Sequence, residues 1–257
     1  AVMGAACFNF AAAFVFGTGA CGVVLPGMLS EAPVGGVSSL RFAAARDRAN
    51  AAAVFLSVAS PYGIEGLAAS RFEAGFEGAA AVAGIDWSGI SHALYREDLL
   101  RGAVALPLRL AGILAGAEAA FLRRRAAGFP AESSSSLCLV AGWRSDRFVS
   151  ARLAFPVIGR GAAPPLRRSW SFDLFTRTLG VGVSRSSPDG VETEHRLEVL
   201  ASLGERTVLR SAYGFRSGEL AVGVLVDIRR VVFGFSWSVN PSLGLSASAG
   251  VGRWWRW

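Results

Sequence analysis

Lysine is absent from this sequence of 257 residues, so its formal net charge of +7 and its isoelectric point of about 10.5 come from arginine alone. A nucleic-acid interface gathers basic side chains on one polar face. Here the arginines are scattered along apolar segments, and runs such as those at residues 123–125 and 167–168 lie beside expected turns. We therefore expect no nucleic-acid partner, and we expect these runs to lie in solvated loops or against lipid headgroups.

Cysteine and histidine are scarce. The three cysteines, Cys7, Cys21 and Cys138, form no CxxC pair and lack ligand-like spacing, which argues against structural zinc and a disulfide framework. The histidines are His92 and His195, and the sequence has no GxSxG, HExxH or P-loop motif. We therefore predict no enzymatic activity and no catalytic, metal-binding or cofactor-binding residues. The alternative is a barrel hydrolase that uses His92, which lies in an expected loop and would need a further catalytic partner.

Long apolar runs are also missing. The sequence is 52% hydrophobic with a mean hydropathy of +0.42, yet beyond residue 30 no uncharged apolar run reaches the length of about 18 residues that a membrane helix requires. A strongly apolar chain without helical spans has one other way to cross a lipid bilayer. That structure is a closed β-barrel, in which hydrogen bonds between strands pair every backbone polar group.

What the sequence does have is alternation with a period of two. In residues 65–75 the charged residues Glu65, Arg71 and Glu73 are all odd-numbered, and in residues 219–229 Glu219 and Asp227 oppose apolar even-numbered positions. Similar alternation runs through nearly every segment from residue 53 onward. Each strand of a membrane barrel turns one parity to lipid and the other to the interior. The fold class predicted is therefore an all-β, transmembrane antiparallel β-barrel.

The last part of the chain shows this pattern clearly. Phe233, Phe235 and Trp237 alternate with small residues, and we expect them to face lipid while their small neighbours face a crowded interior. The aromatic cluster at Trp254, Trp255 and Trp257 fits the girdle of a membrane interface, where amphipathic rings prefer to lie. A soluble β-sandwich is the competing fold, because its strands alternate as well, with the apolar face turned inward.

Turn-forming residues divide the body into strands. Short turns are expected at residues 60–63, 204–205, 217–218, 229–230 and 240–241, with longer loops at 86–98, 124–135, 159–168 and 186–192. The central estimate is about 12 strands, within a range of 10–14, because membrane strands span about 9 to 11 residues. Residues 169–185 break parity near Thr178, so that stretch holds either a bulge or two strands.

The inward parity defines candidate lumen-lining residues. We expect charged pairs of Arg71 with Glu73, of Arg196 with Glu194 or Glu198, and of Arg210 with Asp227. These pairs would line a pore, or they would hold a narrow barrel together as a hydrogen-bonded network. The full set of candidates is Arg71, Glu73, Arg109, Glu118, Arg152, Glu194, Arg196, Glu198, Arg206, Arg210 and Asp227.

The first 30 residues carry no charge and are expected to form a signal or targeting segment, followed by a single barrel domain at residues 31–257. Small residues suitable for signal-peptide cleavage occur at 18–20 and also at 11–13. Two alternatives stay open: lipid modification at Cys21, and retention of the segment as an apolar first strand or a plug.

The terminal strand resembles the signature that the barrel-assembly machinery recognises in bacterial outer-membrane barrels, carried here by Val251, Trp255 and Trp257. Residues 95–108, 109–123 and 240–251 are similar to PorV/PorQ-like proteins, relatives of the FadL-type fatty-acid transporters. This resemblance implies an outer-membrane location, contact with membrane lipid and the assembly machinery, and no cofactor. It further implies passive transport of small or hydrophobic solutes, or a non-enzymatic role in secretion with a secretion-system partner. The alternative is a structural or docking barrel with a closed lumen.

Overall fold

The computed structural model describes residues 51–257 apart from 78–80, 109–112, 146–148, 162–166, 176–178, 189–192, 205, 230 and 257. The expected targeting segment at residues 1–30 lies outside the described part of the chain. No helix in the described ranges is long and apolar enough to cross a membrane. The strands are β1 (Ala51–Ser60), β2 (Ala68–Glu77), β3 (Val82–His92), β4 (Tyr95–Pro107), β5 (Ile113–Ala126), β6 (Glu132–Ser145), β7 (Val149–Arg160), β8 (Arg167–Phe175), β9 (Leu179–Pro188), β10 (Glu194–Leu203), β11 (Thr207–Gly214), β12 (Leu220–Ile228), β13 (Val231–Asn240) and β14 (Gly244–Arg256).

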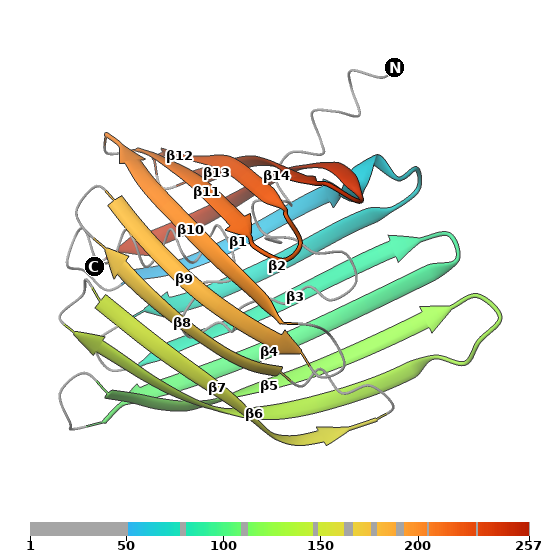
Figure 1. Cartoon of the computed structure of the whole chain (residues 1–257), viewed down its shortest axis with the longest axis horizontal. Coiled ribbons are helices and arrows are strands. Elements are labelled where there is room, and N and C mark those ends of the chain that lie inside the picture. The colour runs from blue at the N-terminus through green and yellow to red at the C-terminus, as the bar shows by residue number, and fades with distance from the viewer. Residues whose placement is uncertain are drawn as a thin grey trace.

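These strands form one closed barrel in which each pairs antiparallel with its neighbours in the chain (Figure 1). Closure comes from pairing of β1 with β14, in a register that sets Ala51 opposite Arg256 and Ser60 opposite Ala247. The sheet therefore has no unpaired edge strand, which is the condition for placing strands in lipid. The predicted fold class, an antiparallel β-barrel, is confirmed.

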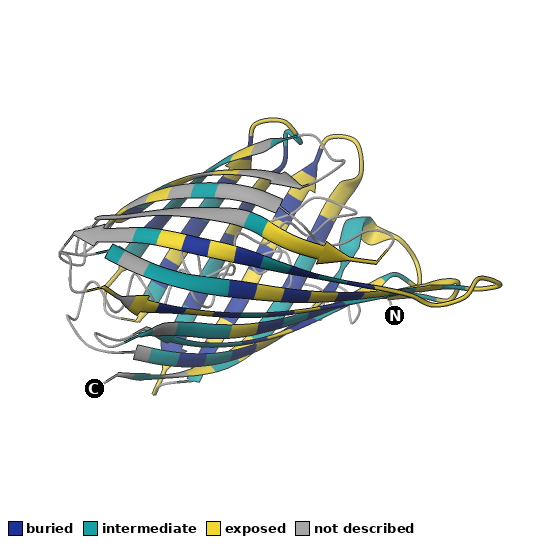
Figure 2. Cartoon of the chain, turned by 90° about the horizontal axis from the view of Figure 1, so that it is seen from below, coloured by how far each residue is buried: buried dark blue, intermediate teal, exposed yellow. Residues whose placement is uncertain are grey.

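The side-chain pattern of the barrel is inverted relative to a soluble protein. Along β13 exposed and buried residues alternate, with Phe233, Phe235 and Trp237 exposed and Ser236 and Ser238 buried. The same alternation of exposed and buried positions runs along other strands whose burial is described, such as β11 and β12 (Figure 2). Large apolar side chains thus cover the outside, and the inside holds buried charged and hydroxyl side chains together with apolar ones, whereas a β-sandwich packs its apolar face inward. The competing sandwich fold is therefore wrong.

The strand count of 14 lies at the upper end of the predicted range, above the central estimate of 12. Two stretches account for the difference. Residues 86–98, expected to be a loop, instead form the ends of β3 and β4 around a short turn at residues 93–94. Residues 169–185 hold two strands, β8 and β9, which was one of the two predicted readings.

The barrel has two different rims. β1 begins and β14 ends at one rim, which we call the near rim, and the opposite end is the far rim. β4, β5 and β6 have 13, 14 and 14 residues, whereas β11 has 8. As a result, the β3–β4 and β5–β6 hairpins reach beyond the other strands on the far side (Figure 1).

Glycine makes room for one aromatic ring at the seam where the barrel closes. Phe55 points inward from β1 and is buried against Gly234, Gly250 and Gly252 on β13 and β14. A Cβ atom at position 250 would lie 2.6 Å from Phe55 Cε1 and 2.8 Å from the Leu56 carbonyl oxygen. The small residues of the last two strands therefore serve close packing behind Phe55.

A cysteine scan should report which parity meets lipid. In a chain with the natural cysteines replaced by alanine, environment-sensitive dyes at Val222 and Val224 should be quenched by lipid-borne quenchers in vesicles. Dyes at Ala221 and Gly223 should be protected, because these residues are buried on the inner side. Equal quenching at the two parities would contradict the inverted arrangement.

Packing at the seam can be tested with one pair of variants. Gly250→Val should lower the free energy of unfolding by about 1 to 3 kcal/mol, because overpacking forces neighbouring atoms to shift. Gly102→Val is the control, since a Cβ at Gly102 meets nothing within 4 Å. Urea unfolding in detergent micelles measures both variants, and equal losses would show that the seam is not closely packed.

Candidate functional site

Five ionisable side chains lie next to one another on the inner wall formed by β2 to β5. This inner charge cluster consists of Arg71 and Glu73 on β2, Asp86 on β3, Arg101 on β4 and Glu118 on β5, all buried. Strand register brings them together, because Glu73 lies opposite Asp86, and Asp86 lies opposite Arg101. Electrostatic attraction also links Arg101 to Glu118.

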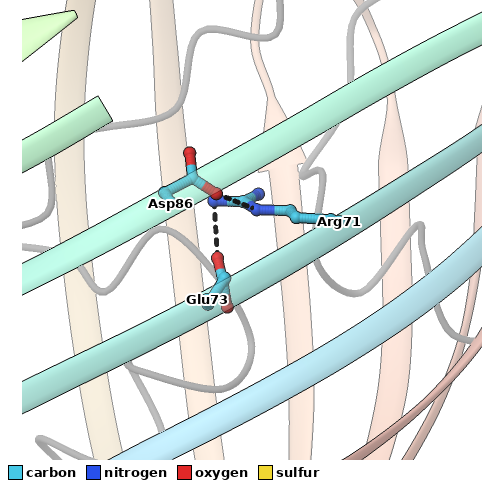
Figure 3. Close-up of polar contacts among 3 residues, drawn as sticks. All are labelled: Arg71, Glu73 and Asp86. Carbon is cyan, nitrogen blue, oxygen red and sulfur yellow. Dashed lines mark hydrogen bonds and ion pairs between the residues drawn. The ribbon is translucent and has the colours of Figure 1, made fainter. Parts of the chain in front are cut away.

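Arg71 holds the middle of the cluster. Its Nε donates to Asp86 Oδ1 at 2.5 Å, and its Nη2 lies 2.5 Å from Glu73 Oε1 (Figure 3). The three side chains are 0%, 1% and 0% exposed for Arg71, Glu73 and Asp86. Like charges directly opposite each other on paired strands repel. Arg71 therefore compensates two carboxylates that would otherwise face each other without water.

The cluster keeps capacity for a further hydrogen-bond donor. Asp86 Oδ2 and Glu73 Oε2 are buried and have no hydrogen-bond partner among the described residues. Buried carboxylate oxygens are normally satisfied by a donor. Protein atoms therefore enclose these two oxygens, so a species in the lumen could reach them only if the surrounding side chains moved.

A second charged group projects from the wall formed by β10 and β11. Arg210 on β11 forms an ion pair with Glu198 on β10, with Nε and Oε1 2.5 Å apart. Electrostatic attraction also couples Arg210 to Glu73, although five strand-to-strand steps around the barrel separate β2 from β11. The charges of the two walls therefore interact through the barrel interior.

Small polar residues line the part of the wall between these two groups. Ser236 and Ser248 are buried and share a hydrogen bond of 3.0 Å between their hydroxyl oxygens. Short side chains on these strands leave the inner volume to the long charged side chains of the other strands. The buried serines of β1, β13 and β14 are Ser57, Ser236, Ser238, Ser246 and Ser248.

Most of the predicted lumen residues that the structure describes lie on the inner side. Arg71, Glu73, Glu118, Arg210 and Asp227 are buried there. Arg196 and Glu198 are half-buried on β10. Arg152 lies in β7 and Glu194 in β10, but the structure does not describe their side chains. Arg109 lies outside the described residues.

Arg206 corrects the predicted set. It is exposed in the turn before β11, which begins at Thr207, so it belongs to the near rim and not to the inner wall. Glu198, predicted as a partner of Arg196, binds Arg210. Parity identifies the face of a strand, but it does not give the height at which residues of neighbouring strands meet.

Sequence reasoning did not include Asp86 or Arg101 among the site residues. Asp86 fell in a stretch expected to be a loop, and its place opposite Glu73 depends on the register of β2 with β3. Arg101 had the right parity, which was the signal available for finding it. The two histidines lie apart from the cluster, with His92 at the end of β3 and His195 exposed on β10.

The expected assembly signal lies on the outer face of β14. Val251 is exposed, Trp255 is half-buried on the same parity, and the Arg253 guanidinium lies 5.4 Å from the centre of the Trp255 ring. Trp257 lies outside the described residues. Recognition of this strand by an assembly partner stays a prediction.

Comparisons with known proteins bear on the fold. No family model matches the sequence, and no curated protein matches it. The structure is similar to Omp33, an outer membrane protein of Acinetobacter baumannii, with a TM-score of 0.51, 7% identity, and coverage of 81% of this chain and 98% of that one. It is also similar to a triple mutant of Rhodopseudomonas blastica porin, with a TM-score of 0.47, 11% identity, and coverage of 80% and 99%.

The chain thus has the fold of a bacterial outer-membrane β-barrel, as predicted. Its apolar outer face and polar inner face fit a lipid environment. The finer resemblance to PorV/PorQ-like proteins is not part of this finding.

Removing the central cation should show what the cluster contributes to stability. Arg71→Gln leaves two buried carboxylates without their cation, and breaking a buried pair in this way typically costs about 3 to 5 kcal/mol. Arg96→Gln is the control, because its pair with Asp98 has side chains 63% and 25% exposed and exposed pairs contribute about 0 to 1 kcal/mol. Urea unfolding in micelles measures both, and similar unfolding midpoints would contradict a central role for Arg71.

Proposed function

We propose that this barrel allows small hydrated polar solutes to pass across the bacterial outer membrane by passive diffusion. The observation that carries the proposal is the charged and hydroxyl-lined interior. The inner charge cluster and Arg210 interact electrostatically from different walls, and buried serines lie on the strands between them. Such a lining offers hydrogen bonds that replace part of a solute's hydration shell.

Barrel size supports a pathway. A barrel of about 8 strands has an interior that side chains fill, and larger barrels enclose wider lumens. This barrel has 14 strands, and short side chains cover much of its inner face at β1, β13 and β14. Charged groups of both signs on the inner wall then favour small ions and zwitterions over bulky or apolar solutes.

A closed structural barrel is the second candidate, and one observation favours it. Arg71, Glu73 and Asp86 are almost completely buried, so the interior at their level is densely occupied. Such a network would hold the walls together without a continuous water path. Conductance separates the two functions.

The other sequence-based hypotheses stay predictions. A hydrophobic solute cannot form hydrogen bonds or ionic contacts with a charged inner wall, so a polar solute is the better match. No contact among the described residues supports a PorV-like role in secretion. Delivery to the outer membrane through the assembly machinery, with Val251 and Trp255 on the recognised strand, is part of the proposal.

Single-channel recording tests the transport function. Purified barrel in planar bilayers should give discrete conductance steps. Arg210→Ser should shift ion selectivity toward cations, and Glu73→Gln should shift it toward anions, because each removes one charge from the inner wall. Reversal potentials in a salt gradient measure both shifts.

Arg253→Ser is the control, because Arg253 is exposed on the outer face close to the near rim. Its loss should leave ion selectivity unchanged. Folded protein that gives no conductance would replace the transport proposal with the closed barrel.

A further inference from the structure

The strands β3 to β6 form a polar β-ribbon where they extend past the barrel on the far side (Figure 2). In its β4–β5 part, Asp98 pairs with Arg123, Glu97 with Arg124, and Arg96 with Arg125. The alternation of inner and outer side chains continues into the ribbon. Glu97 and Arg124 therefore lie on its inner face, which continues the wall of the lumen. The other four residues, Arg96, Asp98, Arg123 and Arg125, lie on its outer face, which continues the lipid-facing side.

Charges on the inner face of the ribbon are compensated. Arg124 donates from Nε to Glu97 Oε2 at 2.8 Å, and Tyr95 donates from its hydroxyl to the same oxygen at 2.6 Å. Glu132 on β6 lies opposite Arg124. Partial burial lowers the pKa of Arg124, but the bonds to Glu97 and Tyr95 outweigh this effect and raise it overall.

The outer face of the same ribbon has an excess of positive charge. Arg96, Arg123 and Arg125 are exposed there, and Asp98 is the acidic residue among them. Asp98 is already engaged by Arg96, through bonds of 2.8 and 3.3 Å from Nε and Nη2. Arg96 and Arg125 lie directly opposite each other, which costs stability between like charges. We call Arg96, Asp98, Arg123 and Arg125 the arginine patch.

The arginine patch lies at the border of the apolar surface. One row toward the barrel, Leu100 pairs with Phe121, and both are exposed on the same outer face. Val104 and Leu106 continue the apolar face along β4, with exposed fractions of 47% and 55%. Guanidinium groups just beyond an apolar band lie at the depth of lipid headgroups.

We propose that the arginine patch binds the phosphate group of a membrane lipid whose acyl chains lie on Leu100 and Phe121. The excess of two positive charges matches a phosphomonoester, which carries a charge of about −1.5 to −2 at neutral pH. Guanidinium forks bind phosphate oxygens in bidentate fashion. Exposed hydroxyls flank the patch, because Ser91 lies opposite Arg96 and Ser133 lies opposite Arg123. The bound anion relieves the repulsion between Arg96 and Arg125, and the proposal does not depend on what passes through the lumen.

Native mass spectrometry of the full chain in detergent, titrated separately with phosphatidic acid, phosphatidylglycerol and phosphatidylcholine, tests this site. The natural chain should bind phosphatidic acid most tightly. The variant Arg96→Gln/Arg123→Gln/Arg125→Gln should lose about a hundredfold in affinity, since each basic residue near a membrane surface contributes roughly fivefold. Asp98→Asn should bind more tightly than the natural chain, because it removes the competing carboxylate.

The matched control is Arg206→Gln/Arg229→Gln/Arg253→Gln, which removes three exposed arginines near the near rim and should leave phosphatidic acid binding unchanged. Heat-modifiable mobility on gels verifies that each variant is folded. Equal losses in the two triple variants would overturn the site, as would unchanged affinity in the first. Displacement of the lipid by inorganic phosphate at equal concentration would overturn the assignment to a lipid.

Discussion

Pairing of the first strand with the last is the interaction on which the rest of this structure depends. Ten register pairs between β1 and β14, from Ala51 with Arg256 to Ser60 with Ala247, close the sheet. In hydrocarbon an unpaired backbone donor or acceptor costs several kcal/mol, so an open sheet of these strands would not be stable there. Closure also encloses an interior that is separated from lipid. In a bilayer, polar side chains of one parity can point into this interior while the apolar side chains of the other parity face lipid.

The polar inside has a constraint of its own, because charges removed from bulk water require compensation. In this structure, residues on neighbouring strands supply the compensating charges. Glu73 and Asp86 are brought face to face by the register of β2 with β3, and Arg71 reaches both. On the other wall Arg210 is matched by Glu198. The same groups thus stabilise the walls and determine the charge of the interior, so that a substitution among them changes both.

The sequence predicted the architecture well because the side-chain period of a strand is a local property. The parity of Arg71, Glu73, Glu118 and Arg210 places each on the inner side, where the structure has them. What local pattern cannot supply is the vertical offset between strands, and this explains why the partner of Arg210 and the position of Asp86 needed the structure. The predicted inward position of Arg206 was wrong for a related reason. When a strand begins one residue later than expected, a residue assigned to the inner face lies in the turn instead.

The charges of the inner face are unevenly distributed around the barrel. β2 to β5 carry five buried ionisable groups, whereas the inner residues beside the β1–β14 seam are alanines, serines, glycines and Phe55. Separating strands within the charged wall would expose carboxylates and guanidinium groups to hydrocarbon, which is expensive. Separating β1 from β14 would expose hydroxyls and backbone instead. The seam therefore depends on its ten register pairs and on the packing of Phe55 against glycine, rather than on charge, to stay closed.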